Sequence, residues 1–365
     1  MPDQGQLRGS LGSVFRNEAF PDVVPMGCRR LPAKQERRVS GRAMILRSVP
    51  RGRLIAQRPV PAVGAIDPET GLRQPDDHRT CLHRSALARV TDISASPHSA
   101  PPAGHATSYQ VALPYLGVFT YTVGRQTAVL DANRTLLVPA GVDFADGHPV
   151  ANLGHASVVI VPSPEVLDEI CRANGVAPER VFTQLSRPVS AAARLATHRL
   201  LMLTENHAES LFADELIVQV LQETLFAGAP MQLARSTRVV DRAKQVIHAR
   251  DRERLSLDEI AREVGVSPVY LTQEFTRTEG LPLHRYRVQL RLGRALVELP
   301  HREDITGLAL DLGFSSHSHF SSAFRRTFGL TPAEFRAWGA RRRKRAVQPV
   351  ATAAGNRRVA AAQVD

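Results

Sequence analysis

His317 and His319, separated by one serine, form the sequence feature closest to a metal-binding pattern. Imidazole nitrogens bind zinc and related ions, but a metal site needs three or four ligands and this pair lacks the others. The three cysteines are widely spaced and form no CxxC pair, and the sequence has no GxxxxGK[ST] loop, GxGxxG turn or GxSxG elbow. We therefore expect no metal, no cofactor and no enzyme activity.

One stretch of the sequence carries side chains suited to reading nucleic-acid bases. Leu271 and Phe275 stand four residues apart, which places them on one face of a helix. At about 100° per residue, Val269, Gln273, Thr276 and Arg277 lie opposite this face and are candidate contacts. Thr272 is a further candidate on the same helix. Gln273 is the best base reader among them, because its amide can bond bidentately to adenine.

A second stretch repeats this arrangement with three phenylalanines on the buried face, Phe320, Phe324 and Phe328. Its outward candidates for DNA contact are His317, Ser318, Ser322, Arg325 and Arg326. The two arginines are expected to hold phosphates rather than read bases. Partly buried packing is the preferred interpretation of Tyr270 and Tyr286.

Helix-turn-helix elements are what would position both sets. Residues 257–267 predict a helix, a glycine corner at Gly265 and an N-cap at Ser267 that opens another helix. The apolar, small and glycine positions recur at matching offsets in residues 305–314. One such unit could be an ordinary helical hairpin, but two in tandem within a basic stretch favour a double DNA reader. Between them, a helix over residues 284–299, about 24 Å long, could hold two recognition helices in neighbouring turns of a major groove.

These residues resemble the AraC/XylS family of transcription regulators over about 100 residues. The likeness lies in Ala261, Gly265, Leu271, Phe275, Gly280, Tyr286, Arg291, Leu292, Ala295, Ile305, Ala309, Gly313, Phe314, Phe320, Phe324, Phe328, Gly329, Pro332, Phe335 and Arg336. The resemblance implies a seven-helix, double helix-turn-helix domain that binds DNA. The family often has arginine where Gln273 and Ser322 stand, so its base specificity does not carry over to this chain.

The upstream part is also similar to that family's regulatory domain, which implies a cupin-like β-barrel followed by dimerisation helices. Its markers are Leu113-Pro114, Gly117-Val118-Phe119 and Val138-Pro139-Ala140-Gly141. The predicted fold class is therefore α+β, with an N-terminal cupin-like β-barrel and dimerisation helices before an all-α double helix-turn-helix domain. Tyr109, Phe119 and Tyr121 have the size and strand positions to line a pocket for an effector.

The charge of +12 is unevenly distributed along the 365 residues. Residues 1–80 carry a net +6, residues 81–235 carry −3, residues 236–345 carry +8 and the last twenty residues carry +1. The basic segment is suited to binding a polyanion such as DNA, and the mildly acidic segment is suited to a separate function. On charge alone, a surface that only keeps the protein soluble is an equally good explanation.

The expected domains follow from composition and periodicity. They are a disordered basic tail at 1–80, a regulatory and dimerisation domain at 84–230, a DNA-binding domain at 236–340, and a disordered basic tail at 341–365. Short β-branched and aromatic runs predict strands at 108–113, 117–123, 126–130, 135–138 and 157–161. Apolar stripes predict helices near 189–205 and 209–226. Those stripes fit core packing or pairing with a second subunit.

We expect a bacterial, cytoplasmic, sequence-specific transcription regulator, an activator, that responds to a small molecule. Its partners would be promoter DNA, RNA polymerase, a small-molecule effector and a second copy of the chain. The apolar runs are too short to span a membrane, and the start lacks a secretory signal pattern. Two alternatives stay open: a cupin-type metal enzyme fused to a DNA-binding module, and an AraC-like regulator without effector. His148 and His155 alone lie near the strands that hold metal in cupins, without the usual HxH and glutamate pattern.

Overall fold

The structure, a computed structural model, describes residues 77–97, 103–203, 210–226, 237–251, 253 and 255–347. Of residues 77 and 341–347 only the backbone is described. All described residues lie in one compact unit, which spans residues 61–365. Most of the two expected basic tails therefore lies outside the described residues.

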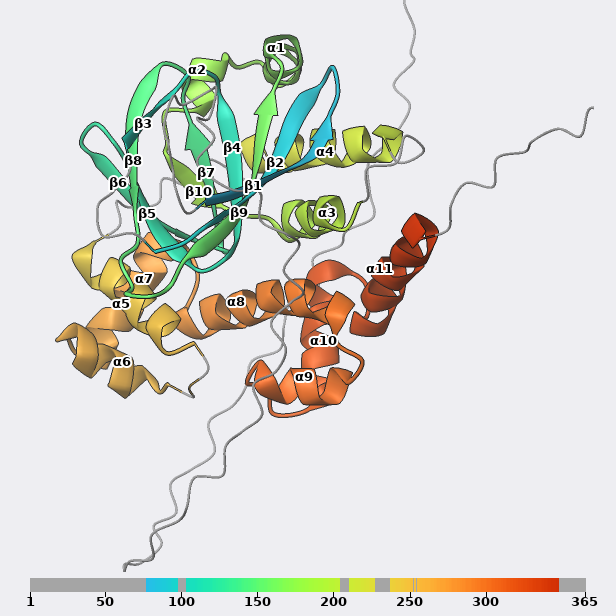
Figure 1. Cartoon of the computed structure of the whole chain (residues 1–365). Coiled ribbons are helices and arrows are strands. Elements are labelled where there is room, and N and C mark those ends of the chain that lie inside the picture. The colour runs from blue at the N-terminus through green and yellow to red at the C-terminus, as the bar shows by residue number, and fades with distance from the viewer. Residues whose placement is uncertain are drawn as a thin grey trace, which may run out of the picture. The chain divides into compact units, whose positions relative to one another are not determined.

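The first part of this unit, the β-region, consists of two antiparallel sheets (Figure 1). The six-stranded sheet has the order β1-β2-β9-β4-β7-β10, and the four-stranded sheet has the order β3-β8-β5-β6. The strands are β1 Asp77–Arg84, β2 Ala88–Ala95, β3 Ala103–Ala106, β4 Gln110–Leu116, β5 Val118–Val123, β6 Gln126–Asp131, β7 Arg134–Val138, β8 Val142–Gly147, β9 His155–Pro162 and β10 Ser186–Pro188.

Alternation along the strands divides their side chains between two cores. Val111 and Leu113 of β4 face a core formed with the covering helices, whereas Ala112 faces the space between the sheets. On β7, Leu137 joins the first core and Leu136 joins the second. This period of two is what a strand buried on both faces requires.

Four helices follow the strands, and α3 and α4 lie over the outer face of the six-stranded sheet (Figure 1). Their bounds are α1 Pro164–Ala173, α2 Pro178–Val181, α3 Ala191–Leu201 and α4 Ser210–Leu225. Ser163 and Ser190 cap α1 and α3 by accepting hydrogen bonds from the amides of Val166 and Ala193. The apolar stripes of α3 and α4 contribute to the core, as one of the two interpretations expected.

The remainder, the helical region, contains two helix-turn-helix units and no strand among its described residues. The bounds are α5 Arg238–Ala249, α6 Leu257–Val264, α7 Pro268–Glu279, α8 Leu283–Glu298, a short 3-10 turn η2 Leu299–His301, α9 Ile305–Asp311, α10 His317–Phe328 and α11 Pro332–Val347. Each unit has its own apolar cluster, with Phe275 and Tyr286 in the first and Phe320 and Phe324 in the second.

The α+β class is confirmed: a β-rich region precedes a helical one. The barrel is the part that differs, because the described strands form two sheets and no strand pairing among them closes these into one barrel. Some element ends also differ from expectation. Strand β1 begins at Asp77, inside the expected tail at 1–80, and α11 runs to Val347, past the expected domain end at 340.

Candidate nucleic-acid interface

The first helix-turn-helix unit is held by local capping. Ser256 and Glu259 form a capping box at the start of α6, with side chain and backbone of each residue bonded to the other. Gly265 then turns the chain with φ of 82°, a conformation that favours glycine. The hydroxyl of Ser267 accepts from the amide of Tyr270 at 3.2 Å and starts α7. The predicted turn and N-cap are confirmed.

The second unit repeats this design with different residues. The carboxylate of Asp304 accepts from the amides of Thr306 and Gly307 at the start of α9. Gly313 supplies the turn with φ of 79°, and the hydroxyl of Ser316 accepts from the amide of His319 at 3.1 Å to start α10. The duplication predicted from the sequence is therefore a duplication in structure.

The nominated DNA contacts lie on the solvent face of α7 and α10. Leu271, Phe275, Phe320 and Phe324 are fully buried, which turns the opposite helix faces outward. Nine of the ten nominated side chains are exposed: Val269, Gln273, Thr276, Arg277, His317, Ser318, Ser322, Arg325 and Arg326. The tenth, Thr272, is half-buried, and its hydroxyl donates to the carbonyl of Pro268 at 2.9 Å.

The two tyrosines behave differently. Tyr286 is fully buried in the first apolar cluster, as packing predicted. Tyr270 is 48% exposed, so about half of its surface is covered, and partial packing stays a prediction for it. It lies one residue after Val269 in the first turn of α7, on the outward side. Tyr270 thus joins the exposed surface of this helix.

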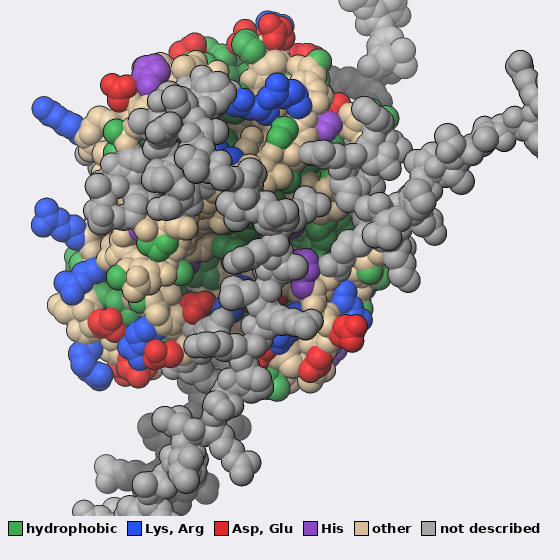
Figure 2. Space-filling view, in the orientation of Figure 1, with side chains coloured by type: hydrophobic (Ala, Val, Ile, Leu, Met, Phe, Trp, Pro, Cys, Tyr) green, Lys and Arg blue, Asp and Glu red, His purple; other side chains and the backbone are tan. Residues whose placement is uncertain are grey.

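Charge is distributed unequally between the two helices. Arg277 forms two hydrogen bonds with Glu274 of the same helix, at 3.0 and 2.5 Å, and this partner lowers the pKa of the Glu274 carboxyl. Arg325 and Arg326 in the last turn of α10 are exposed. On the face shown in Figure 2, basic and acidic side chains are interspersed rather than gathered in one patch. Of the candidate arginines, Arg277 on α7 is thus paired with a carboxylate of its own helix, whereas two exposed arginines lie at the end of α10.

Helix α8 joins the two units, and Figure 1 shows it running from α6 and α7 toward α9 and α10. Its 16 residues correspond to about 24 Å. Arg287 donates to the carbonyl of Leu255 just before α6, and Arg291 donates to the carbonyl of Gly313 at 3.0 Å. Because these two arginines lie one helical turn apart on the same rod, α8 holds both units in a fixed relation.

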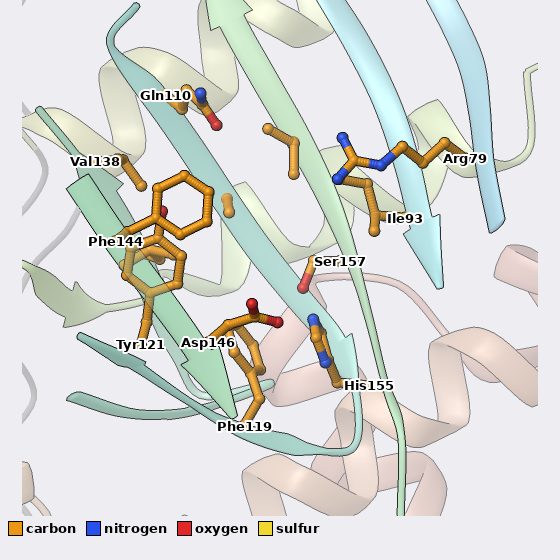
Figure 3. A pocket seen from close by; sticks show the side chains of 13 residues that line it. Arg79, Ile93, Gln110, Phe119, Tyr121, Val138, Phe144, Asp146, His155 and Ser157 are labelled. Atoms are coloured by element: carbon orange, nitrogen blue, oxygen red, sulfur yellow. The ribbon is translucent and has the colours of Figure 1, made fainter. Parts of the chain in front are cut away.

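A cavity lies between the two sheets of the β-region. Figure 3 shows the stacked rings of Tyr121 and Phe144, with centroids 4.9 Å apart, beside the polar side chains of Asp146, His155 and Ser157. Burial raises the pKa of Tyr121. The lining residues are Arg79, Ile93, Gln110, Ala112, Phe119, Tyr121, Leu136, Val138, Phe144, Asp146, His155, Ser157 and Val159.

Two of the three residues nominated for an effector, Phe119 and Tyr121, line this cavity. Tyr109 does not, because it precedes β4 and packs on Phe182, with ring centroids 4.7 Å apart, in the core on the other side of the sheet. The sequence reasoning missed Phe144 and Asp146. They lie on β8, a strand that it did not predict, although Phe144 and Asp146 alternate as a strand pattern requires.

His148 and His155, the two histidines near the strands that hold metal in cupins, contact each other. His148 Nε2 and His155 Nδ1 lie 3.0 Å apart, which makes them hydrogen-bond partners. The described residues contain no group of three or more His, Cys, Asp or Glu side chains arranged to hold an ion. None of the described helices is both long and apolar enough to cross a bilayer.

Comparison with known proteins agrees with the helix-turn-helix geometry. The family model of a helix-turn-helix domain matches residues 260–337. The regulatory protein SoxS of Salmonella typhimurium is 40% identical over 83 residues, which cover 22% of this chain and 78% of SoxS. The chain belongs to the AraC/XylS family.

Other relatives match this AraC/XylS-family chain over a smaller share of their length. The HTH-type transcriptional regulator ArgR of Pseudomonas aeruginosa is 34% identical over 144 residues, 38% of this chain and 44% of ArgR. The Msm operon regulatory protein of Streptococcus mutans is 32% identical over 99 residues, 27% of this chain and 35% of that protein. The chain thus matches less than half the length of these two relatives.

Among solved structures, an AraC-type transcriptional regulator from Chromobacterium violaceum is similar to the AraC/XylS-family chain. It is 39% identical over 28% of this chain and 92% of that structure, with a TM-score of 0.27. ToxT from Vibrio cholerae is 11% identical over 69% of this chain and 98% of that structure, with a TM-score of 0.28.

Proposed function

We propose that the chain is a sequence-specific transcription regulator that docks on promoter DNA through both helix-turn-helix units. One observation carries this proposal: two capped units, each with an exposed polar recognition face, are tied by arginines to the same 24 Å helix. The repeat of a major groove is about 34 Å. Helices α7 and α10 can therefore enter neighbouring turns on one side of the duplex.

The recognition faces suggest a division of roles. Gln273 reads a base through its amide, and Val269, Thr276 and Tyr270 offer contacts to thymine methyl groups or the backbone. Arg325 and Arg326 neutralise phosphates, assisted by His317, Ser318 and Ser322 near the start and middle of α10. Helix α7 thus supplies most of the sequence preference, and α10 supplies most of the salt-dependent affinity.

We propose further that the cavity between the sheets takes a small-molecule effector. Aromatic walls at Phe119, Tyr121 and Phe144 with a few polar groups match the composition of small-molecule sites. An effector regulates only if it binds one arrangement of the protein better than another, because equal affinity for both shifts nothing. The proposed partners are RNA polymerase and a second copy of the chain, at promoters in the cytoplasm.

Selection of genomic fragments by the purified full chain tests the proposal. We expect enrichment of promoter fragments that carry two short sequence blocks about 10 base pairs apart, centre to centre. The variant Arg325→Ala/Arg326→Ala should retain much less DNA at the same salt concentration, since it loses two phosphate contacts. The matched control Arg172→Ala/Arg180→Ala removes two arginines from α1 and α2 and should select the same fragments. Retention of no fragment above background by the unchanged chain would refute the function.

A further inference from the structure

The turn between β6 and β7 reaches from the β-region into the helical region. The hydroxyl of Tyr286 on α8 donates to the carboxylate of Asp131, and Nε2 of His248 on α5 lies 3.1 Å from the same carboxylate. The amide of Asn133 donates to the backbone carbonyl of Tyr286 at 3.1 Å, and its oxygen accepts from Arg194 of α3 at 2.9 Å. Burial would raise the pKa of Asp131, but the hydrogen bond from His248 and the charge of Lys244 outweigh it and hold that pKa low. A buried carboxylate is therefore kept charged between the regions.

The same turn also holds the end of the first recognition helix. Glu279, the last residue of α7, forms an ion pair with Lys244 of α5 at 2.6 Å, and Arg134 of β7 lies 3.6 Å from its other oxygen. The side chains of Lys244 and Glu279 are each only 2% exposed. We name the set Asp131, Asn133, Arg134, Lys244, Glu279 and Tyr286 the latch.

The opposite end of the helical region meets the β-region differently. The apolar cluster of the first unit is built only from residues of the helical region. The cluster of the second unit also includes Leu195 of α3, with Met202 packed against it. The guanidinium of Arg199 lies 5.7 Å from the ring centre of Trp338 on α11, which adds to this contact. Polar groups thus dominate the attachment of the first unit, and apolar packing dominates that of the second.

These two kinds of contact respond differently to separation. Charged groups lose hydration when they are buried, and they recover it when the surfaces part, so an ion-pair interface can open at modest cost. Exposure of apolar side chains to water costs free energy, so the contact between α3 and the second unit resists opening. Because α8 is a rigid rod between the two units, release of the latch would let the helical region turn about its contact with α3.

The latch is also connected to the cavity. Leu136 and Val138 of β7 line the cavity, and Arg134 begins the same strand two residues earlier. Asn133 and Arg134 therefore move with any shift of β7. A small molecule in the cavity that displaces β7 therefore also displaces the latch residues at the start of this strand.

We propose that the latch is a releasable contact that joins the cavity to the DNA-reading helices, and that the chain binds DNA more weakly while the latch is closed. This inference rests on the proposed function. The described residues between 81 and 226 include 9 Lys and Arg and 11 Asp and Glu, a net charge of −2. A closed latch holds this region against the end of α7, where its net negative charge repels phosphates. Opening of the latch lets the helical region approach the DNA duplex without this negative charge beside it.

A reversible lock tests the proposal in the full chain. A Cβ atom built on Gly293 of α8 would lie 3.6 Å from the Cβ of Ala132, within the range that a disulfide needs. That Cβ also lies 3.1 Å from the end of the Arg194 side chain, which must move slightly. Ala132→Cys/Gly293→Cys therefore closes the latch covalently when oxidised and releases it when reduced. The unchanged chain with and without reductant controls for its own cysteines.

The complementary variant, Asn133→Ala/Arg134→Ala, removes the latch contacts made by the β6–β7 turn, and we call it the cut variant. Arg125→Ala is the matched control, since it removes an exposed arginine from the neighbouring β5–β6 turn. We expect the cut variant to bind a selected promoter fragment about five-fold or more tightly than the unchanged chain, and the oxidised lock to bind it more weakly by a similar factor. Reduction of the lock and the Arg125→Ala variant should both give the affinity of the unchanged chain.

A measurement without DNA keeps this inference separate from the proposed function. Spin labels at positions 125 and 262, both exposed, report the distance between the β-region and the first unit. In a background without native cysteines, we expect the cut variant to show a longer or broader distance distribution than the unchanged latch. Equal distributions, or equal DNA affinities of the locked and cut forms, would overturn the latch. Absence of DNA binding in every form, with a distance change in the cut variant, would refute the proposed function alone.

Discussion

At the scale of single residues, the proposed interface separates side chains that read bases from side chains that hold the backbone. Gln273 presents an amide with a donor and an acceptor in fixed geometry, which a particular base edge can match. Arg326 presents a charge on a flexible stem, which any phosphate can neutralise. Both are exposed on helices whose other face is fully buried. Substitutions at the two positions should therefore have different consequences.

Replacement of Gln273 by alanine should cost about 1 to 3 kcal/mol at one base position and relax the preference there. Arg326→Ala should weaken binding to all DNA sequences alike and reduce the slope of log affinity against log salt concentration by about one. Titrations against an operator library at several salt concentrations measure both effects. Identical behaviour of the two variants across the library would mean that the roles are assigned wrongly.

Glu274→Gln should strengthen DNA binding. The carboxylate of Glu274 is hydrogen-bonded to Arg277, and its removal frees this arginine for a phosphate. We expect the plot of log affinity against log salt to become steeper by about one unit. Glu263→Gln is the control, because it also removes one negative charge, that of a residue on the neighbouring α6 that pairs with Arg250 at the end of α5. Equal effects of both variants would show that net charge alone is responsible.

At the scale of elements, locally encoded features were predictable and distant ones were not. Serine caps and glycine turns lie within a few residues of the helices that they define, so the spacing of Gly265 and Ser267 was enough to predict the first unit. The strands Ala103–Ala106 and Ser186–Pro188 were not predicted, because they are three or four residues long and exist only through pairing with β8 and β7. Such strands have no periodicity of their own to detect.

The two turn glycines should differ in their tolerance of a side chain. Both have positive φ, for which any other residue costs about 1 to 2 kcal/mol. A Cβ on Gly265 would meet open space, whereas one on Gly313 would lie 3.0 to 3.4 Å from the guanidinium of Arg291. We expect Gly313→Ala to lower the free energy of unfolding more than Gly265→Ala, measured by chemical denaturation. An equal loss would show that Arg291 moves aside without cost.

At the scale of the whole molecule, long-range polar contacts decide where several residues lie. Tyr286 is buried against Asp131, which is 155 residues away in the sequence. The apolar pattern around Tyr286 predicted its burial, but no local signal indicates that a turn of the β-region receives its hydroxyl. Helical periodicity could predict the candidate recognition surface, because that surface depends on neighbours along one helix. It could not predict the latch, whose residues come from β6, β7, the turn between them, α5, α7 and α8.

His198 should make the stability of the chain sensitive to mild acid. Burial lowers its pKa from 6.5 to about 4, and its Nδ1 donates to the carbonyl of Arg194 at 2.9 Å. Below pH 6.5 the unfolded chain binds a proton that the folded chain does not, so stability falls as the pH approaches 4. This residue should cost about 2 kcal/mol at pH 5 relative to pH 7.5. Denaturation of the chain and of His198→Gln at both pH values measures the difference, which should be smaller in the variant; an equal pH dependence would exclude this role.

The paired attachment of both units to α8 has a consequence for the DNA that the chain would recognise. Arg287 and Arg291 fix the separation of the two contact patches, and the candidate base contacts lie on α7 and α10 rather than on α8. One inserted base pair would move the second patch by about 3.4 Å and rotate it by about 34°. The promoters that the chain regulates should therefore keep a constant number of base pairs between the two contacted blocks, whereas the sequence of those base pairs should vary.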